Sequence, residues 1–148
     1  MNISSVVDSD FDMLYRFAKG IPELKVSATE EFMDRDEFKW AMRNPNGIFL
    51  VAKIGLKIVG FINANMRDIE RPYPRKWACL VYLAVAKDSR KYGIATLLYK
   101  ACINILKEKG ITDVYGWANA ESDGAIIAFM KKQGFAEGHK YIWMDKEI

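Results

Sequence analysis

The chain has 148 residues, of which 51% are hydrophobic and 28% charged, and its formal net charge is +3 at pH 7. This length is enough for one domain with a buried core, and the apolar content excludes an intrinsically disordered chain. The net charge is too small to predict a nucleic-acid partner, and no binding motif for nucleic acid is present. We therefore expect a single domain over residues 1–148.

The sequence carries no signal for export, membrane insertion or metal binding. The longest apolar run, Ala78 to Ala86, has nine residues, which is too short to span a bilayer. The first residues are acidic and lack the cationic region of a secretory signal. Cys79 and Cys102 lie in apolar segments without the spacing of a metal or redox site. We expect a cytoplasmic protein with buried thiols, no metal and no membrane partner.

Hydrophobic periodicity in the first half predicts a weak first strand, two amphipathic helices and a hairpin. Asp8 or Asp10 can cap the first helix, and Gly20 and Pro22 end it. These patterns predict a strand at 2–7, a helix at 11–19, a loop or broken helix at 23–33, a helix at 34–43, and strands at 47–54 and 57–67.

The second half alternates strands and helices. Residues 76–86 are apolar on both faces, which is typical of a strand in the middle of a sheet. The remaining predicted elements are a helix at 93–109, a strand at 112–118, a helix at 124–133, and two last strands, one starting at Phe135 and one at 141–146. The order β-α-α-β-β-β-α-β-α-β-β predicts an α/β fold with a mixed, mostly antiparallel central sheet flanked by helices.

The most informative stretch is Asp88 to Thr96, which joins the long apolar strand to the helix that follows it. The first turn of a helix has unpaired N–H groups and the positive end of the helix dipole, so it favours a phosphate or pyrophosphate. Gly93 and Ala95 let a ligand approach the backbone, and Arg90 and Lys91 add positive charge. A plain strand-to-helix turn with two solvated cations would give the same pattern.

Arg90, Gly93 and Ala95 form the pattern R-x-x-G-x-A, which resembles the pyrophosphate loop of the GNAT superfamily of acyl-CoA-dependent N-acetyltransferases. The element order and the late pair Gly134-Phe135 are similar to this family as well, so the resemblance covers nearly the whole chain.

The resemblance implies acetyl-CoA or coenzyme A as cosubstrate and direct attack of an amine on its acetyl group. It implies that the main chain of Leu83, Ala84 and Val85 holds the pantetheine arm in a gap beside a bulged fourth strand, and that an amide near Val85 stabilises the oxyanion. The pyrophosphate would then meet the loop residues Arg90, Lys91, Tyr92, Gly93, Ile94, Ala95 and Thr96.

The chain departs from the family at positions that carry proton transfer. The usual tyrosine acid is Met130, which cannot donate a proton, and a common asparagine is Asp123, which can cap a helix instead; both would still line the cofactor site. Two usual positions of the basic glutamate are Cys79 and Ala118. The candidate catalytic replacements are Tyr82, Tyr115 and Tyr141, although aromatic residues on strands more often pack in a core.

The region between Asp8 and Glu37 holds nine acidic against four basic residues, which suggests a cationic amine acceptor such as a polyamine, an aminoglycoside-like amine or a basic peptide. Helix-terminal charge and solubility explain the same excess. Asp68, Glu70, Arg71 and Arg75 could instead select an anionic group. The acceptor therefore stays open, as does the choice between a monomer and a homodimer.

Three classes of function compete. The first is an active N-acetyltransferase, and the second is a non-catalytic module that binds or senses acyl-CoA, which the changes at Met130, Asp123 and Cys79 favour. The third is an unrelated nucleotide-binding protein, for which the glycine-rich phosphate motifs are missing. We expect the first.

Overall fold

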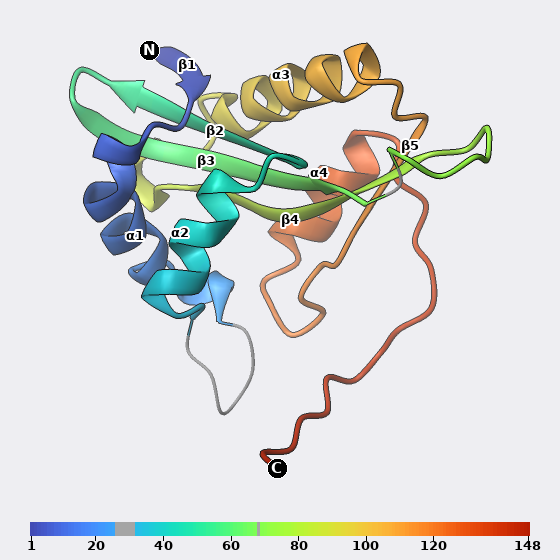
Figure 1. Ribbon diagram of the computed structural model, residues 1–148. Helices are drawn as coiled ribbons and strands as arrows, with labels where there is room; N and C mark the ends of the chain where they lie inside the picture. Colours follow the sequence, from blue (N-terminus) through green and yellow to red (C-terminus); the bar gives the residue numbers. More distant parts are fainter. Residues whose placement is uncertain (26–31, 68) are drawn as a thin grey trace.

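The computed structural model describes residues 1–25, 32–67 and 69–148. Figure 1 shows a twisted sheet with helices on both faces. The strands are β1 (Asn2–Ser5), β2 (Gly47–Ile54), β3 (Lys57–Met66), β4 (Trp77–Val85) and β5 (Asp113–Gly116), and the α-helices are α1 (Phe11–Lys19), α2 (Arg35–Arg43), α3 (Ile94–Glu108) and α4 (Ala125–Lys132). Short 3-10 helices η1 (Asp8–Asp10), η2 (Pro22–Leu24) and η3 (Lys87–Ser89) lie between them.

The strands follow chain order across the sheet, β1-β2-β3-β4-β5. The first three pairings are antiparallel and the β4–β5 pairing is parallel. A parallel pair needs a crossover connection, and α3 provides it. The prediction of an α/β fold with a mixed, mostly antiparallel sheet is therefore confirmed.

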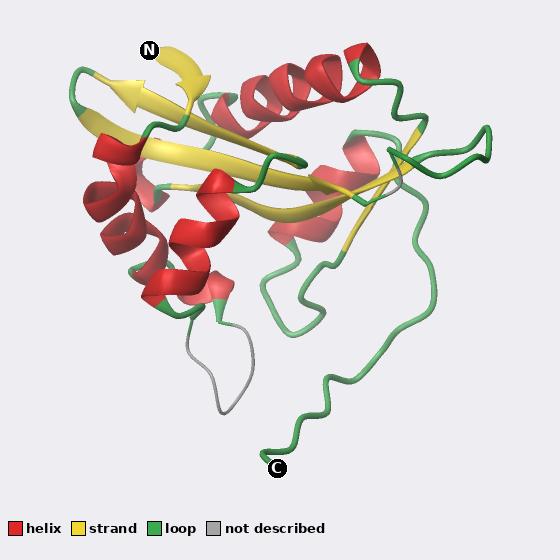
Figure 2. Cartoon of the chain, viewed as in Figure 1, coloured by secondary structure: helices red, strands yellow, loops and turns green. Residues whose placement is uncertain are grey.

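Each face of the sheet has its own hydrophobic core, as the two helical layers of Figure 2 indicate. On β2, Ile48 and Leu50 face α3, whereas Phe49 and Val51 face α1 and α2, in the two-residue period of a strand. Leu98, Cys102 and Leu106 of α3 are almost fully buried on the first face. Phe38 of α2 and Phe61 of β3 are fully buried on the second and meet edge-on at 6.3 Å.

For the elements that form, the predicted boundaries agree with the observed ones to within two residues. Asp34 is the N-cap of α2, where its side chain accepts a hydrogen bond from the Asp36 N–H at 2.8 Å. The predicted loop at 23–33 lies partly outside the described residues, as do Asp68 and two of the nine acidic residues, Glu30 and Glu31.

The two last predicted strands are wrong. Residues 133–148 contain no strand, and Figure 1 shows the segment leaving the sheet as an extended arm. Phe135 still packs near Tyr99 of α3, with ring centroids 6.1 Å apart, but Tyr141 and Ile142 are exposed. The alternation and apolar content are suitable for a strand, but no strand of the described chain pairs with this segment. A strand needs a partner to satisfy its backbone.

No helix among the described residues combines the length and the apolar content that crossing a membrane requires.

Gly60 of β3 provides a test of how closely the sheet and α3 pack. A Cβ at this residue would lie 2.9 Å from the Ala84 carbonyl oxygen and 3.2 Å from Leu98. We expect Gly60→Ala to lower the free energy of unfolding by about 1–3 kcal/mol, because overpacking forces backbone shifts. Gly138→Ala is the control, since nothing lies within 4 Å of a Cβ there. Urea unfolding of both variants measures the difference; equal midpoints would contradict this account of Gly60.

Candidate functional site

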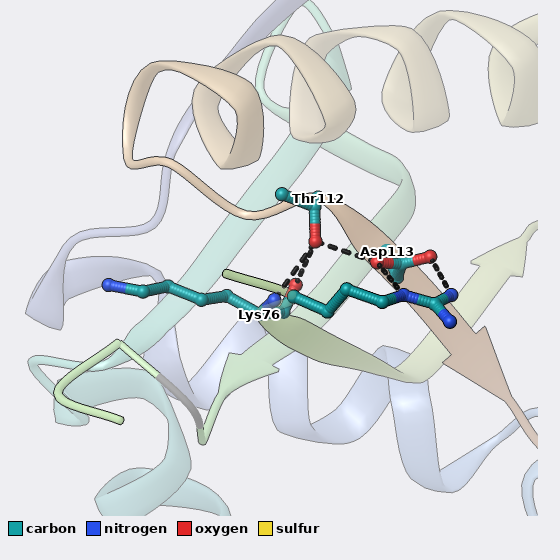
Figure 3. A network of polar contacts seen from close by, with 4 residues as sticks. Lys76, Thr112 and Asp113 are labelled. Atoms are coloured by element: carbon teal, nitrogen blue, oxygen red, sulfur yellow. Dashed lines mark hydrogen bonds and ion pairs between the residues drawn. The ribbon is translucent and has the colours of Figure 1, made fainter. Parts of the chain in front are cut away.

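Side-chain hydrogen bonds and an ion pair join the parallel strands β4 and β5 where their pairing begins. The Thr112 hydroxyl accepts a hydrogen bond from the Lys76 N–H at 2.9 Å and donates one to the Asp113 carboxylate at 2.6 Å (Figure 3). The Arg75 guanidinium binds both oxygens of Asp113, at 2.6 and 3.2 Å, and these contacts hold the pKa of that carboxyl below its ordinary value. Polar contacts therefore fix the spacing of the two strands at this end.

At the other end the same two strands separate. Their pairing runs from Trp77 with Asp113 to Leu80 with Gly116 and stops there. Residues 81–85 of β4 have no partner on β5, although residues 82–85 still pair with β3. One edge of β4 is consequently open over its last residues.

A β-bulge lies where the opening starts. Asn63 of β3 pairs with Tyr82, and the next residue, Ala64, pairs with Leu80, so Val81 is an extra residue on β4. A bulge bends its strand and increases the local twist, which turns the end of β4 away from the direction of β5. Asn63 is 1% exposed; its Nδ2 donates to the Ile48 carbonyl at 3.2 Å, while its Oδ1 is a buried acceptor without a partner in the described chain.

The backbone of β4 directs hydrogen-bonding groups into the opening. The Ala86 N–H donates to the Val59 carbonyl on β3 at 2.9 Å. Because successive residues of a strand direct their N–H and C=O groups to alternate sides, the groups of Leu83 and Val85 point away from β3. The Val85 carbonyl accepts a hydrogen bond from Arg90 Nε at 3.2 Å, in agreement with this direction. Ala84 contributes its buried side chain to the α1–α2 core instead.

The loop after β4 presents backbone N–H groups. Lys91 and Gly93 both have positive φ angles, 72° and 77°, and Gly93 directly precedes α3. Among the described residues, the amides of residues 91–96 donate to no backbone carbonyl outside α3. The Leu97 amide donates to the Gly93 carbonyl and is the first amide of the helix with a backbone partner. Nothing lies within 4 Å of the position of a Cβ on Gly93. The arrangement is an accessible, positively polarised concavity for an anion.

Arg90 does not point freely into this concavity. Its guanidinium donates to Val85 and to Glu23 Oε1 of η2, the latter at 2.7 Å, and this contact lowers the pKa of Glu23. Lys57 on β3 holds the loop from the other side by an ion pair with Asp88 at 3.0 Å. The role predicted for the Arg90 side chain beside a pyrophosphate therefore requires that it leave Glu23, whereas Lys91 is exposed.

Met130 of α4 lies where the two strands separate. A Cβ on Gly116 would lie 3.2 Å from Met130 Cε and from the Leu80 carbonyl oxygen, which places the thioether beside the last β4–β5 pair. Asp123 is exposed, and its Oδ1 accepts from the Ala125 N–H at 3.0 Å. Asp123 thus lies just before the N-cap residue of α4, Gly124, and binds the first helical amide, which is close to the capping role that the sequence suggested.

The three candidate tyrosines lie in different surroundings. Tyr82 faces the α1–α2 layer, 5.9 Å from the ring of Phe32, and burial followed by the charge of Glu37 raises its pKa. Tyr115 stacks edge-on with Trp77 at 6.1 Å and hydrogen-bonds to Cys79. Tyr141 is 73% exposed on the C-terminal arm and touches Trp117. The structure therefore does not bring the three together.

Both cysteines are buried free thiols. Burial raises the pKa of Cys79, and it raises that of Cys102 to about 12. Neither thiol is in a state suited to nucleophilic attack near neutral pH.

Comparison with known proteins assigns the chain to a family. The sequence model of the Acetyltransferase (GNAT) family matches residues 11–135. The chain belongs to the GNAT acetyltransferase family. N-acetyltransferase 8F1 of Rattus norvegicus is 27% identical over 132 residues, a match that covers 89% of this chain and 59% of the rat protein. The chain spans about half the length of the curated relatives it matches.

Solved structures show the same GNAT fold. An aminoglycoside acetyltransferase from an uncultured soil metagenomic sample, in complex with sisomicin, superposes with a TM-score of 0.74 at 20% identity, over 99% of this chain and 96% of that one. An aminoglycoside N-acetyltransferase in complex with CoA gives 0.76 at 15% identity, over 99% of this chain and 100% of the other. At these identities the likeness establishes the fold alone.

The residues present fit a CoA thioester. The open edge of β4 offers donors and an acceptor at Leu83 and Val85, and the amides of residues 91–96 follow a few residues later in the chain. Sequence patterns located the loop, and the resemblance to the family implied a bulged fourth strand, but neither placed the bulge at Val81 or revealed the contact of Arg90 with Glu23. The spacing of apolar residues shows no break at the bulge, and Glu23 is 67 residues away in the sequence.

Glycine substitutions at the two ends of α3 test the anion site. Gly93 and Gly110 have nearly equal positive φ angles, 77° and 79°, and open space around a Cβ. We expect Gly93→Glu to abolish CoA binding in calorimetric titration, because a carboxylate would occupy the anion concavity. Gly110→Glu brings the same backbone strain and charge to the far end of the helix and should bind normally. Equal affinity of both folded variants would refute the placement.

Proposed function

We propose that this protein is an N-acetyltransferase that transfers the acetyl group of acetyl-CoA to an amine within a ternary complex. The observation that carries the proposal is the open edge of β4 at Leu83 and Val85, followed within a few residues by a helix terminus whose amides, at 91–96, lack backbone partners outside α3. One strand edge and one helix terminus can bind an extended amide-containing arm and a pyrophosphate respectively. Membership of the GNAT family supports the acetyl transfer itself.

The backbone at the end of β4 orients the reacting groups. When bound, acetyl-CoA supplies an activated acetyl group and a thiolate leaving group. The Val85 N–H points into the opening and is the donor for the oxygen that gains negative charge as the amine attacks. The Arg90 guanidinium holds the Val85 carbonyl at 3.2 Å and so fixes the peptide that follows the donor. Holding the reacting groups in position in this way accelerates acetyl transfer without an additional charged side chain.

Proton transfer differs from the common family pattern. Met130 lies at the separation of β4 and β5 but has no proton to give, so the thiolate leaves without a side-chain acid at that position. On the α1–α2 side, burial followed by the charge of Glu37 raises the pKa of Tyr82. Glu37 is exposed in the first turn of α2 and directly precedes Phe38, whose ring contacts that of Phe32, a neighbour of the Tyr82 ring. Glu37 is the described carboxylate that we assign to the amine, either as its counter-ion or as the receiver of its proton.

The acidic excess between Asp8 and Glu37 is largely matched by partners. Asp8 pairs with Arg43 at 2.8 Å, Asp10 with Lys53, and Asp12 with Arg35. Asp34 caps α2, and Glu23 binds Arg90. Because these carboxylates already have partners, only a few acidic residues, among them Glu37, remain to attract a cationic acceptor. We keep a cationic acceptor, such as a polyamine or an aminoglycoside-like amine, on this narrower ground.

A module that binds acyl-CoA without turnover is the second candidate, and the methionine at position 130 is the observation that favours it. Purified protein incubated with acetyl-CoA and a panel of polyamines, aminoglycosides, amino acids and basic peptides separates the two. Amine-dependent release of CoA thiol supports the enzyme, whereas binding without release for every amine supports the module. The absence of CoA binding would contradict both.

Substitution of Met130 tests whether the missing acid limits turnover. We expect Met130→Tyr to raise kcat, because a phenol at the strand separation can protonate the leaving thiolate, and well-placed acid catalysis contributes about 10²-fold or more. Met130→Phe is the matched control, since it adds the same ring without the hydroxyl. A rise with both variants would assign the effect to packing; no rise with tyrosine would mean that thiolate departure is not limiting.

Glu37 and its neighbour Asp36 form a second matched pair on the first turn of α2. We expect Glu37→Gln to raise the KM for a cationic acceptor about tenfold, the effect of roughly 1.4 kcal/mol, while the KM for acetyl-CoA is unchanged. Asp36→Asn should leave both constants near those of the parent protein. Steady-state kinetics with the best amine of the panel measures this, and an unchanged acceptor KM in Glu37→Gln would remove Glu37 from the site.

A further inference from the structure

The side chain of Arg90 joins the loop after β4 to the helical layer that α1 begins. Its Nη2 donates to Oε1 of Glu23 at 2.7 Å, although the two residues are 67 positions apart in the sequence. Glu23 lies in η2, which follows α1 on one face of the sheet, whereas Arg90 lies just before α3 on the other face. Because Arg90 Nε also donates to the Val85 carbonyl at 3.2 Å, the ion pair connects the two helical layers at the end of β4.

This ion pair is better protected than the other one that holds the loop. The side chains of Arg90 and Glu23 are 35% and 40% exposed, compared with 65% and 66% for Lys57 and Asp88. Charges with less exposure are screened less by salt. The hydrogen bond from Arg90, followed by a backbone hydrogen bond, lowers the pKa of Glu23. Its carboxylate is therefore charged at neutral pH and holds the guanidinium.

Glu23 opposes the positive charge of Arg90 beside the anion concavity. Arg90 directly precedes the amides of residues 91–96, which form that concavity. A guanidinium binds phosphate and carboxylate oxygens with the same N–H donors, so the Nη2 donor that Glu23 occupies is one that a phosphate would use. The charge of Asp123 also acts on Glu23, which places a second carboxylate near the ion pair. The free protein thus offers an anion less positive charge than its loop sequence suggests.

The Glu23 side chain can leave Arg90 without disturbing either core. η2 has three residues, none of them buried, and no side-chain cap. Its turn is closed by backbone hydrogen bonds, from Leu24 to Ile21 at 3.1 Å and from Lys25 to Pro22 at 3.2 Å. These bonds do not involve the carboxylate. A phosphate oxygen can therefore replace the carboxylate at Nη2 while Nε remains on Val85.

We propose that Glu23 is a latch on the cofactor site, which holds Arg90 in the free protein and yields it to the pyrophosphate of the cofactor on binding. The inference rests on the proposed use of acetyl-CoA. The exchange breaks one ion pair of Arg90 and forms another, and no covalent bond changes. Because breaking the contact with Glu23 costs free energy, the latch weakens the binding of acetyl-CoA and of the product CoA alike. It closes again when CoA leaves and so favours product release.

Calorimetric titration with CoA tests the latch. We expect Glu23→Gln, which keeps the size of the side chain and removes its charge, to bind CoA about fivefold more tightly, the effect of a partly exposed ion pair. The control is Asp12→Asn, which removes an equal charge and an ion pair with Arg35 from the same helical layer. This control should bind CoA like the parent protein. Thermal unfolding shows whether each variant is folded.

A second background separates the latch from a general effect of charge. In Arg90→Gln, the further change Glu23→Gln should leave the affinity for CoA unchanged, because no guanidinium remains to be released. An equal gain in both backgrounds would overturn the proposal, since it would reflect net charge alone. Unchanged or weaker binding by the folded single variant Glu23→Gln would overturn it too. A parent protein that does not bind CoA would instead contradict the proposed function, and the latch with it.

An NMR titration of the Glu23 carboxyl tests the latch in the parent protein without any substitution. Arg90 and Asp123 are the charged groups that act on this carboxyl, and the hydrogen bond from Arg90 lowers its pKa in the free protein. When CoA binds, that pKa should rise, because the carboxylate loses its partner and meets the negative charge of the phosphates. A pKa of Glu23 that is the same with and without bound CoA would show that the ion pair stays closed, and the proposal would fail.

Discussion

The separation of β4 from β5 is the constraint on which the rest of the site depends. Two strands cannot be paired at one end and apart at the other unless something fixes the closed end and something bends the open one. The contacts of Thr112 and Asp113 with residues 75 and 76 do the first, and the extra residue Val81 does the second. Met130 matters because it lies beside the opening so formed, and the loop amides because they follow the open end of β4 within a few residues.

Two hydrophobic cores make this opening compatible with a stable sheet. α3 on one face and α1 with α2 on the other bury nearly all of β2 and β3, which remain paired along their length. The strand that opens is supported through its other edge by β3. The N–H groups of Leu83 and Val85 that face the opening are thus held in place, so a ligand that binds them pays little entropy to order them.

The sequence revealed the elements that have strong local signals and missed those that depend on distant partners. The loop from Arg90 to Thr96 was found because a turn glycine, small residues and charges occur together, and α1 to α4 because their apolar residues follow a helical period. The resemblance to the family implied a bulge on this strand, but its position stayed hidden, because residues 78–86 are apolar on both faces and a shift in alternation leaves no trace. The last strands were predicted from pattern alone, yet a strand exists only where a second strand pairs with it, and pattern does not name that partner.

The bulge changes the bend of the sheet without changing which side chains pack in each hydrophobic core. One residue is added to β4 only, so Leu80 and Leu83 on either side of it both face α3, as Ala64 and Ile62, their partners on β3, do. A chain shorter by this one residue would keep every other side chain of β4 in its layer and lose only the bend. In this fold, a plain sheet and a sheet with a binding edge therefore differ by a single inserted amino acid, and such a change is open to evolution without any rearrangement of the core.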